Sequence, residues 1–124
     1  MNPPVLKIGQ VLVASVQSEL SDQAAIALRD AVTDAFARER ALGVIIDISG
    51  LPIVDSFLGR ILVETAHMIR ILGGQVVISG VSPALAITVV ELGLPLEKIV
   101  TALTLEEALL KLGGSVGHSE SGNS

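Results

Sequence analysis

Apolar residues along the chain first gather in two short runs and then recur with helical spacing. The runs 5–8 and 11–16 are rich in aliphatic residues, and only Gly9-Gln10 separates them. Glycine at the first central position of a two-residue turn suits a type II′ β-hairpin, so two antiparallel strands are predicted. From Ser21 onward apolar residues recur every three or four positions. This predicts an amphipathic helix that is capped by Ser21 and ends near Gly43.

The remainder of the chain repeats one pattern, a short apolar strand followed by a helix. The first of these strands, 44–48, is almost wholly apolar, as a central strand covered on both faces would be. Glycines follow each expected helix and predict where it stops. The expected pairs are strand 44–48 with a helix from Asp55 or Ser56 to Leu72, strand 75–79 with a helix from Ser82 or Pro83 to Leu92, and strand 99–100 with a helix from Thr104 to Leu112, closed by Gly113-Gly114.

Three successive strand-helix units require right-handed crossovers and a parallel sheet, to which the hairpin adds an antiparallel edge. We therefore expect one α/β domain over residues 1–114, with a mixed, mostly parallel sheet and about four helices. Residues 115–124 are mainly glycine, serine and asparagine, so they are predicted to form a disordered polar tail.

Composition narrows the possible functions. The 124 residues include no cysteine, which excludes disulfides, thiolate nucleophiles and Cys-ligated metals and fits a cytoplasmic location. A net charge of -5 and only two aromatic residues argue against nucleic-acid binding. The most apolar stretch, 84–96, is too short to cross a membrane, and no signal peptide is visible. A mean hydropathy of +0.69 favours self-association or a protein partner.

The loop 49–56 is the most informative of those that follow the strands, where ligands and reactive groups gather in parallel α/β sheets. It begins after Asp47, bends at Gly50 and Pro52, and leads to Asp55-Ser56 at an expected helix start. Spacing alone favours a plain structural role, with Asp55 as the N-cap and Ser56 in the first turn.

Enzyme motifs are missing from the sequence. No GxSxG, GxxxxGK[ST], GxGxxG or HExxH pattern occurs, and neither His67 nor His118 is placed to serve as a catalytic base. We therefore expect no enzymatic activity, no cofactor and no metal.

The segment 44–57 resembles the signature of the STAS domains, the anti-sigma factor antagonist family. In that family an apolar strand ending in aspartate leads through a short loop to Asp-Ser at a helix start. The order of hairpin, long helix and three strand-helix units extends the resemblance over about residues 3–112. Many bacterial antagonists continue Asp-Ser-Ser/Thr-Gly, whereas here Phe57-Leu58 follow Ser56. This departure favours the RsbS-like branch, the small single-domain scaffolds of the stressosome.

The resemblance implies a non-enzymatic scaffold that holds a switch kinase and releases it when Ser56 is phosphorylated. Asp55 matches the preceding acidic residue and Asp47 the strand-end aspartate, while Ser49, Gly50 and Phe57 complete the implied partner-binding loop. Phe57 is either an exposed anchor or, as we favour, a core residue. The implied partners are an RsbT-like serine kinase, RsbR-like STAS paralogues, further copies of this chain and a phosphatase. Two alternatives stay open: a monomeric anti-sigma factor antagonist, and an accessory domain that binds a nucleotide or lipid.

Overall fold

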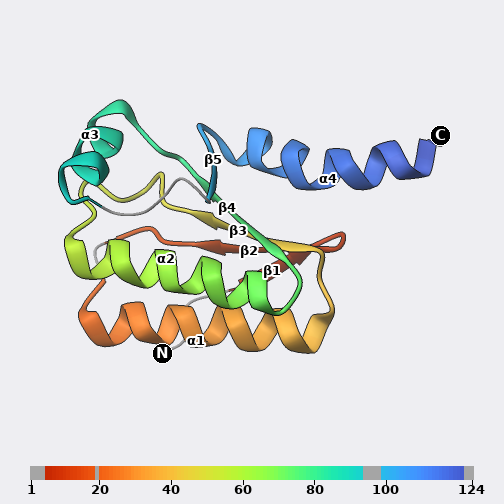
Figure 1. Ribbon diagram of the computed structural model, residues 1–124, viewed down its shortest axis with the longest axis horizontal. Coiled ribbons are helices and arrows are strands. Elements are labelled where there is room, and N and C mark those ends of the chain that lie inside the picture. Colours follow the sequence, from red (N-terminus) through yellow and green to blue (C-terminus); the bar gives the residue numbers. More distant parts are fainter. Residues whose placement is uncertain (1–4, 19, 94–98, 122–124) are drawn as a thin grey trace.

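The structure is a computed structural model that describes residues 5–18, 20–93 and 99–121. Five strands and four helices alternate after an initial hairpin (Figure 1). Their bounds are β1 Val5–Ile8, β2 Val11–Ser15, α1 Asp22–Glu39, β3 Gly43–Asp47, α2 Ser56–Ile71, β4 Gln75–Ser79, α3 Pro83–Glu91, β5 Val100–Ala102 and α4 Leu105–Ser121.

The strands form one sheet in the order β1-β2-β3-β4-β5. The pair β1-β2 is antiparallel, and the three following pairs are parallel. In the hairpin Ile8 pairs with Val11, and Gly9 adopts a φ of +62°, so the predicted two-residue turn is present. The predicted fold class, a mixed sheet with an N-terminal antiparallel hairpin and four helices, is confirmed.

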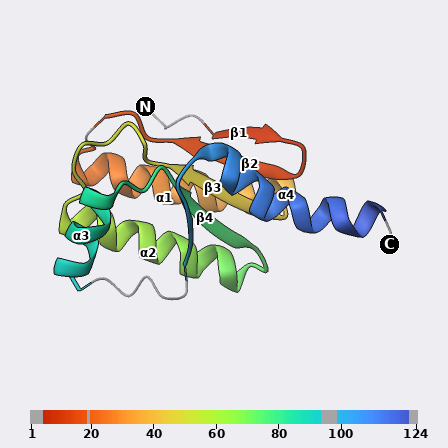
Figure 2. The ribbon, with the colours of Figure 1, turned by 90° about the horizontal axis from the view of Figure 1, so that it is seen from above.

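Helices cover both faces of the sheet, as Figures 1 and 2 show. The helices α1 and α2 lie side by side on one face with their N-terminal ends together, and α4 crosses the other face. Val44, Ile45 and Ile46 in β3 are each 0 % exposed and point alternately to the two apolar clusters. The expectation of a central strand buried on both sides is therefore correct.

Serine and threonine side chains cap three of the described helices at their starts, including the predicted cap Ser21. Ser21 Oγ accepts a hydrogen bond from the N–H of Ala24, and Ser82 Oγ accepts one from the N–H of Leu85. At the start of α4 the N–H of Glu107 donates to Thr104 Oγ, while the Glu107 carboxylate accepts from the N–H of Leu103. Each bond satisfies an amide that the helix itself leaves without a partner.

Two predicted helix ends are wrong. The first helix ends at Glu39 with Arg40 in the left-handed conformation, and Gly43 instead begins β3. A Cβ at Gly43 would lie 2.8 Å from the Gln75 carbonyl oxygen, so this glycine serves strand packing. The last helix continues through Gly113 to Ser121, replacing much of the predicted tail, and 122–124 lie outside the described residues. Glycine weakens a helix by about 1 kcal/mol relative to alanine but does not forbid it.

Candidate functional site

The segment between β3 and α2 is tied at its start to both neighbouring strands. The N–H of Ile48 donates to the Ser79 carbonyl at 2.9 Å, and the N–H of Val16 donates to the Asp47 carbonyl at 2.9 Å. The N–H of Leu51 then donates to the Ile48 carbonyl at 3.0 Å and closes the first turn. These hydrogen bonds fix the backbone of the first loop residues relative to the sheet.

The Asp47 carboxylate holds two serine side chains. Ser49 Oγ donates to Oδ2 at 3.0 Å and Ser79 Oγ donates to Oδ1 at 2.9 Å. Asp47 and Ser79 are register partners in β3 and β4, and Ser79 is fully buried. A buried hydroxyl needs a partner, so the bond to Asp47 fixes the carboxylate while Ser49 links it to the loop.

Glycines let two other segments approach this loop closely. Gly80, at φ +84°, lies so near Ser49 that a Cβ would be 2.5 Å from the Ser49 amide nitrogen. A Cβ at Gly50 would be 3.0 Å from Cα of Gln17. Sequence reasoning assigned no role to Gly80 or Ser79. The signal that could have found them is their place at the end of β4, directly beside Asp47 in a parallel sheet.

Asp55 and Ser56 form the start of α2. Asp55 Oδ1 accepts the N–H of Leu58 at 2.8 Å, so the N-cap role favoured from spacing is confirmed. Ser56 is the first helical residue and is exposed, and its hydroxyl has no hydrogen-bond partner among the residues that the structure describes. The free amides and the positive end of the helix dipole lie beside this hydroxyl.

Phe57, the second residue of α2, is less exposed than Ser56 before it. It is half-buried and packs against the main apolar cluster. The core assignment is therefore the better one for this residue. The exposed apolar group near Ser56 is instead Ile53, whose residue surface is 60 % exposed.

Asp55 and Ile53 border a shallow cavity between the starts of α1 and α2. Its volume is about 370 Å³, and Leu20, Ser21 and Leu58 complete its lining. The N-cap residues of two helices, Ser21 and Asp55, thus face one surface depression. The surface beside Ser56 combines polar caps with one exposed aliphatic side chain.

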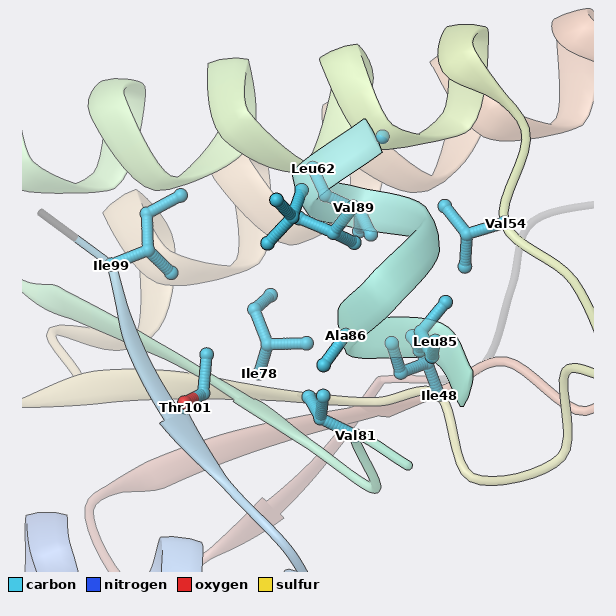
Figure 3. Close-up of a pocket in the computed structure, with 12 residues that line it drawn as sticks. Ile48, Val54, Leu62, Ile78, Val81, Leu85, Ala86, Val89, Ile99 and Thr101 are labelled. Carbon is cyan, nitrogen blue, oxygen red and sulfur yellow. The ribbon is translucent and has the colours of Figure 1, made fainter. Parts of the chain in front are cut away.

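A second cavity lies behind the loop, between α2, α3 and the sheet (Figure 3). Its volume is about 410 Å³, and Thr101 is the one hydroxyl-bearing residue in a lining that is otherwise aliphatic or glycine. Figure 3 shows Val54 from the loop and Leu85 and Val89 from α3 around this space. Among the described residues no charged side chain lines this cavity, so none of them offers a cation for a phosphate group.

The described part of the chain contains no group of three residues able to hold a metal ion. None of its helices is long and apolar enough to cross a membrane. His67 is exposed on α2, and the side chain of His118 lies outside what the structure describes.

Of the predicted site residues, Asp47 and Ser49 are in direct contact, and Gly50 follows at the turn. Asp55 and Ser56 lie together at the exposed end of the same loop. The loop therefore has an anchored beginning and an accessible end.

A family model described as the STAS domain matches residues 2–108. The chain is 26 % identical to the RsbT co-antagonist protein RsbRA of Bacillus subtilis (strain 168). The match extends over 98 residues, or 79 % of this chain. That match covers 34 % of RsbRA, so the chain spans about a third of this relative's length.

Two solved structures share both sequence and fold with the chain. A glutamate-for-serine variant of RsbS from Moorella thermoacetica is 34 % identical with a TM-score of 0.84, over 94 % of this chain and 99 % of that one. A chain from a structure of the stressosome, described as a signal integration and transduction hub, is 32 % identical with a TM-score of 0.78, over 91 % and 98 %.

Proposed function

The chain belongs to the STAS domain family, and from that premise we propose that it is a non-enzymatic, phosphorylatable scaffold of a stressosome-type signalling complex. In this role it holds a serine kinase while Ser56 is unmodified and releases it when Ser56 carries phosphate. The observation that carries the proposal is the position of Ser56, exposed as the first residue of α2 on a loop anchored through Asp47.

The position suits a phosphoryl group. Phosphoserine carries a charge of about -1.5 to -2, and a helix N-terminus stabilises such charge through its dipole and free amides. The domain therefore has no need to refold when it is modified. A kinase seated over Asp55 and Ser56 instead meets a dianion beside an existing carboxylate. Binding would bury both negative charges at the interface, and removing them from water without a partner costs several kcal/mol, of which each 1.4 kcal/mol is a tenfold loss of affinity.

The proposed partners follow from the relatives. RsbRA is named a co-antagonist of RsbT, which supports an RsbT-like kinase as the sequestered protein. The likeness to RsbS and to a stressosome chain supports assembly with further copies and with RsbR-like paralogues. A phosphatase would reset Ser56, and the whole cycle would operate in the cytoplasm.

Phosphorylation is tested by incubating the protein with ATP and an RsbT-like kinase from the same source, followed by intact-mass measurement and peptide mapping. We expect one added phosphate in the wild type and none in Ser56→Ala. The matched control is Ser18→Ala, which removes an exposed serine that lies outside this loop and should still gain one phosphate. No phosphate from a kinase that is active on another substrate, or a phosphate elsewhere, refutes the proposal.

Sequestration needs a separate measurement. Kinase affinity for the unmodified and phosphorylated forms should differ by about 30-fold or more, which corresponds to about 2 kcal/mol. Equal affinities would exclude release by phosphorylation. Elution of the chain, alone or with its paralogues, far above the 12.8 kDa of one copy separates the scaffold from a monomeric antagonist.

One observation favours a second function, the apolar cavity behind the loop. Its volume lies in the range of small-ligand sites, and its aliphatic lining suits an acyl chain and not a nucleotide. Titration with medium-chain fatty acids, followed by the melting temperature, tests this alternative. An unchanged melting temperature at saturating ligand argues against it.

A further inference from the structure

Arg60 is an exposed cation one helical turn beyond Ser56, and within the described part of the chain it has no partner. Four other basic side chains are engaged: Lys7, Arg29 and Arg38 with carboxylates, and Lys111 with the Thr101 carbonyl. Arg60 makes no hydrogen bond or ion pair with any residue in the described ranges. The described structure therefore shows no hydrogen bond or ion pair through which the Arg60 guanidinium would stabilise the fold.

The spacing of Ser56 and Arg60 places both side chains on one face of α2. Residues four apart in a helix have Cβ atoms about 5–6 Å from each other. Helical side chains lean toward the N-terminus, so a long side chain at position 60 extends back over the turn that begins at Ser56. An acidic group placed four residues before a basic group is also the favourable order for such a pair.

Two carboxylates near Arg60 in the sequence are already engaged, and an acidic residue on the neighbouring helix is exposed and forms no ion pair with Arg60. Glu64, four residues after Arg60, binds Arg29 of α1 at 3.2 Å. Asp55 Oδ1 caps the amide of Leu58 at 2.8 Å. Asp22, in the first turn of the neighbouring helix α1, is exposed to solvent. Arg60 is thus left available for a negative group that arises at Ser56.

We propose that Arg60 captures the phosphoryl group of phosphorylated Ser56 and holds it against the start of α2. This inference rests on the proposed function, because it requires Ser56 to be modified. The planar guanidinium forms paired, charge-assisted hydrogen bonds to phosphate oxygens. Capture alters the partner surface at two residues: Ser56 gains charge, and Arg60 is withdrawn from any acidic group of the kinase.

The test uses the 124-residue chain with phosphoserine installed at position 56 during translation, so that no kinase is needed. Phosphorus NMR then follows the second ionisation of the phosphate with pH at low ionic strength. Arg60 should hold the phosphoserine pKa about half a pH unit below its value in Arg60→Gln, roughly a threefold change in the dissociation constant. Arg60→Lys should keep part of this difference, because it keeps the charge and loses the fork geometry.

The matched control is Arg40→Gln, which removes a charge from the opposite end of the α1-α2 pair and should leave the phosphate pKa at the wild-type value. Identical pKa values in the wild type and Arg60→Gln would overturn the capture. That result would leave kinase phosphorylation of Ser56 untouched. Conversely, failure of the kinase reaction would leave the NMR result valid, so the two proposals fail separately.

Discussion

Replacing Asp47 by alanine should destabilise the domain through the buried hydroxyl of Ser79. Asp47 Oδ1 is the acceptor for this fully buried group at 2.9 Å, and Oδ2 accepts from the exposed Ser49 at 3.0 Å. A buried polar group left without a partner costs about 1–3 kcal/mol, and the exposed bond adds about 0.5 kcal/mol. We therefore expect Asp47→Ala to lower the free energy of unfolding by about 2–3 kcal/mol.

Two matched variants separate the two bonds. Ser49→Ala removes only the exposed donor and should cost about 0.5 kcal/mol. Ser79→Ala removes the buried hydroxyl itself, so no buried group is left without a partner, and we expect the free energy of unfolding to fall by about 1 kcal/mol. The Asp47→Ala/Ser79→Ala double variant has no buried hydroxyl left without a partner. Its free energy of unfolding should therefore fall by less than the sum of the two single-variant losses.

The assay is urea unfolding followed by circular dichroism, with the denaturant slope checked for each variant. A loss of about 2–3 kcal/mol at an unchanged slope would lower the urea midpoint by about 0.7–3 M, given a slope of about 1–3 kcal/mol per molar urea. An Asp47→Ala variant no less stable than Ser49→Ala would refute the reasoning, because Ser79 would then not depend on the carboxylate.

Substitutions at three further residues test the site, two of them beside a matched variant. Gly80→Ala should lower the free energy of unfolding by about 2–4 kcal/mol, because the added Cβ clashes with Ser49 and the positive φ is strained. Gly93→Ala, at φ +68° in open space, has the strain without the clash and should cost only about 1–2 kcal/mol. Equal melting temperatures of the two variants would disprove the close approach of Gly80 to Ser49. Asp55→Ala should lower the free energy of unfolding by about 1 kcal/mol through loss of the cap, and Asp55→Asn should restore most of it in urea titrations. Phe57→Ala should cost about 2 kcal/mol in unfolding, as befits a half-buried ring; no loss would mean that its packing contributes little to stability.

Local signals explain which features could be read from the sequence. A helix cap depends on a residue and an amide three positions later, so Ser21, Asp55 and Ser82 were recognisable by type and spacing alone. The mostly parallel sheet with an antiparallel hairpin followed from the alternation of strands and helices, because strands joined through a helix run parallel.

Contacts between distant segments explain what could not be read. Asp47 and Ser79 are 32 positions apart, and only the register of β3 against β4 brings them together. Glycine is ambiguous for the same reason: Gly43 looks like a helix stop, yet its missing side chain makes room for Gln75 and for Leu112 of α4. Such a glycine carries no local mark of its role.

The arrangement of the loop suits a signal that is read by a partner. The first residues of the loop are fixed by the bond from the buried Ser79 hydroxyl to Asp47 and by backbone hydrogen bonds to two strands. Ser56 takes part in none of these contacts. The end of the loop is an exposed helix start, where the dipole offsets part of a new negative charge. Under the proposed function we therefore expect phosphorylation of Ser56 to change the stability of the domain little and the affinity for the kinase more. The ratio of two effects tests this: phosphorylation should change kinase affinity by about 2 kcal/mol or more while moving the free energy of unfolding by less than about 1 kcal/mol.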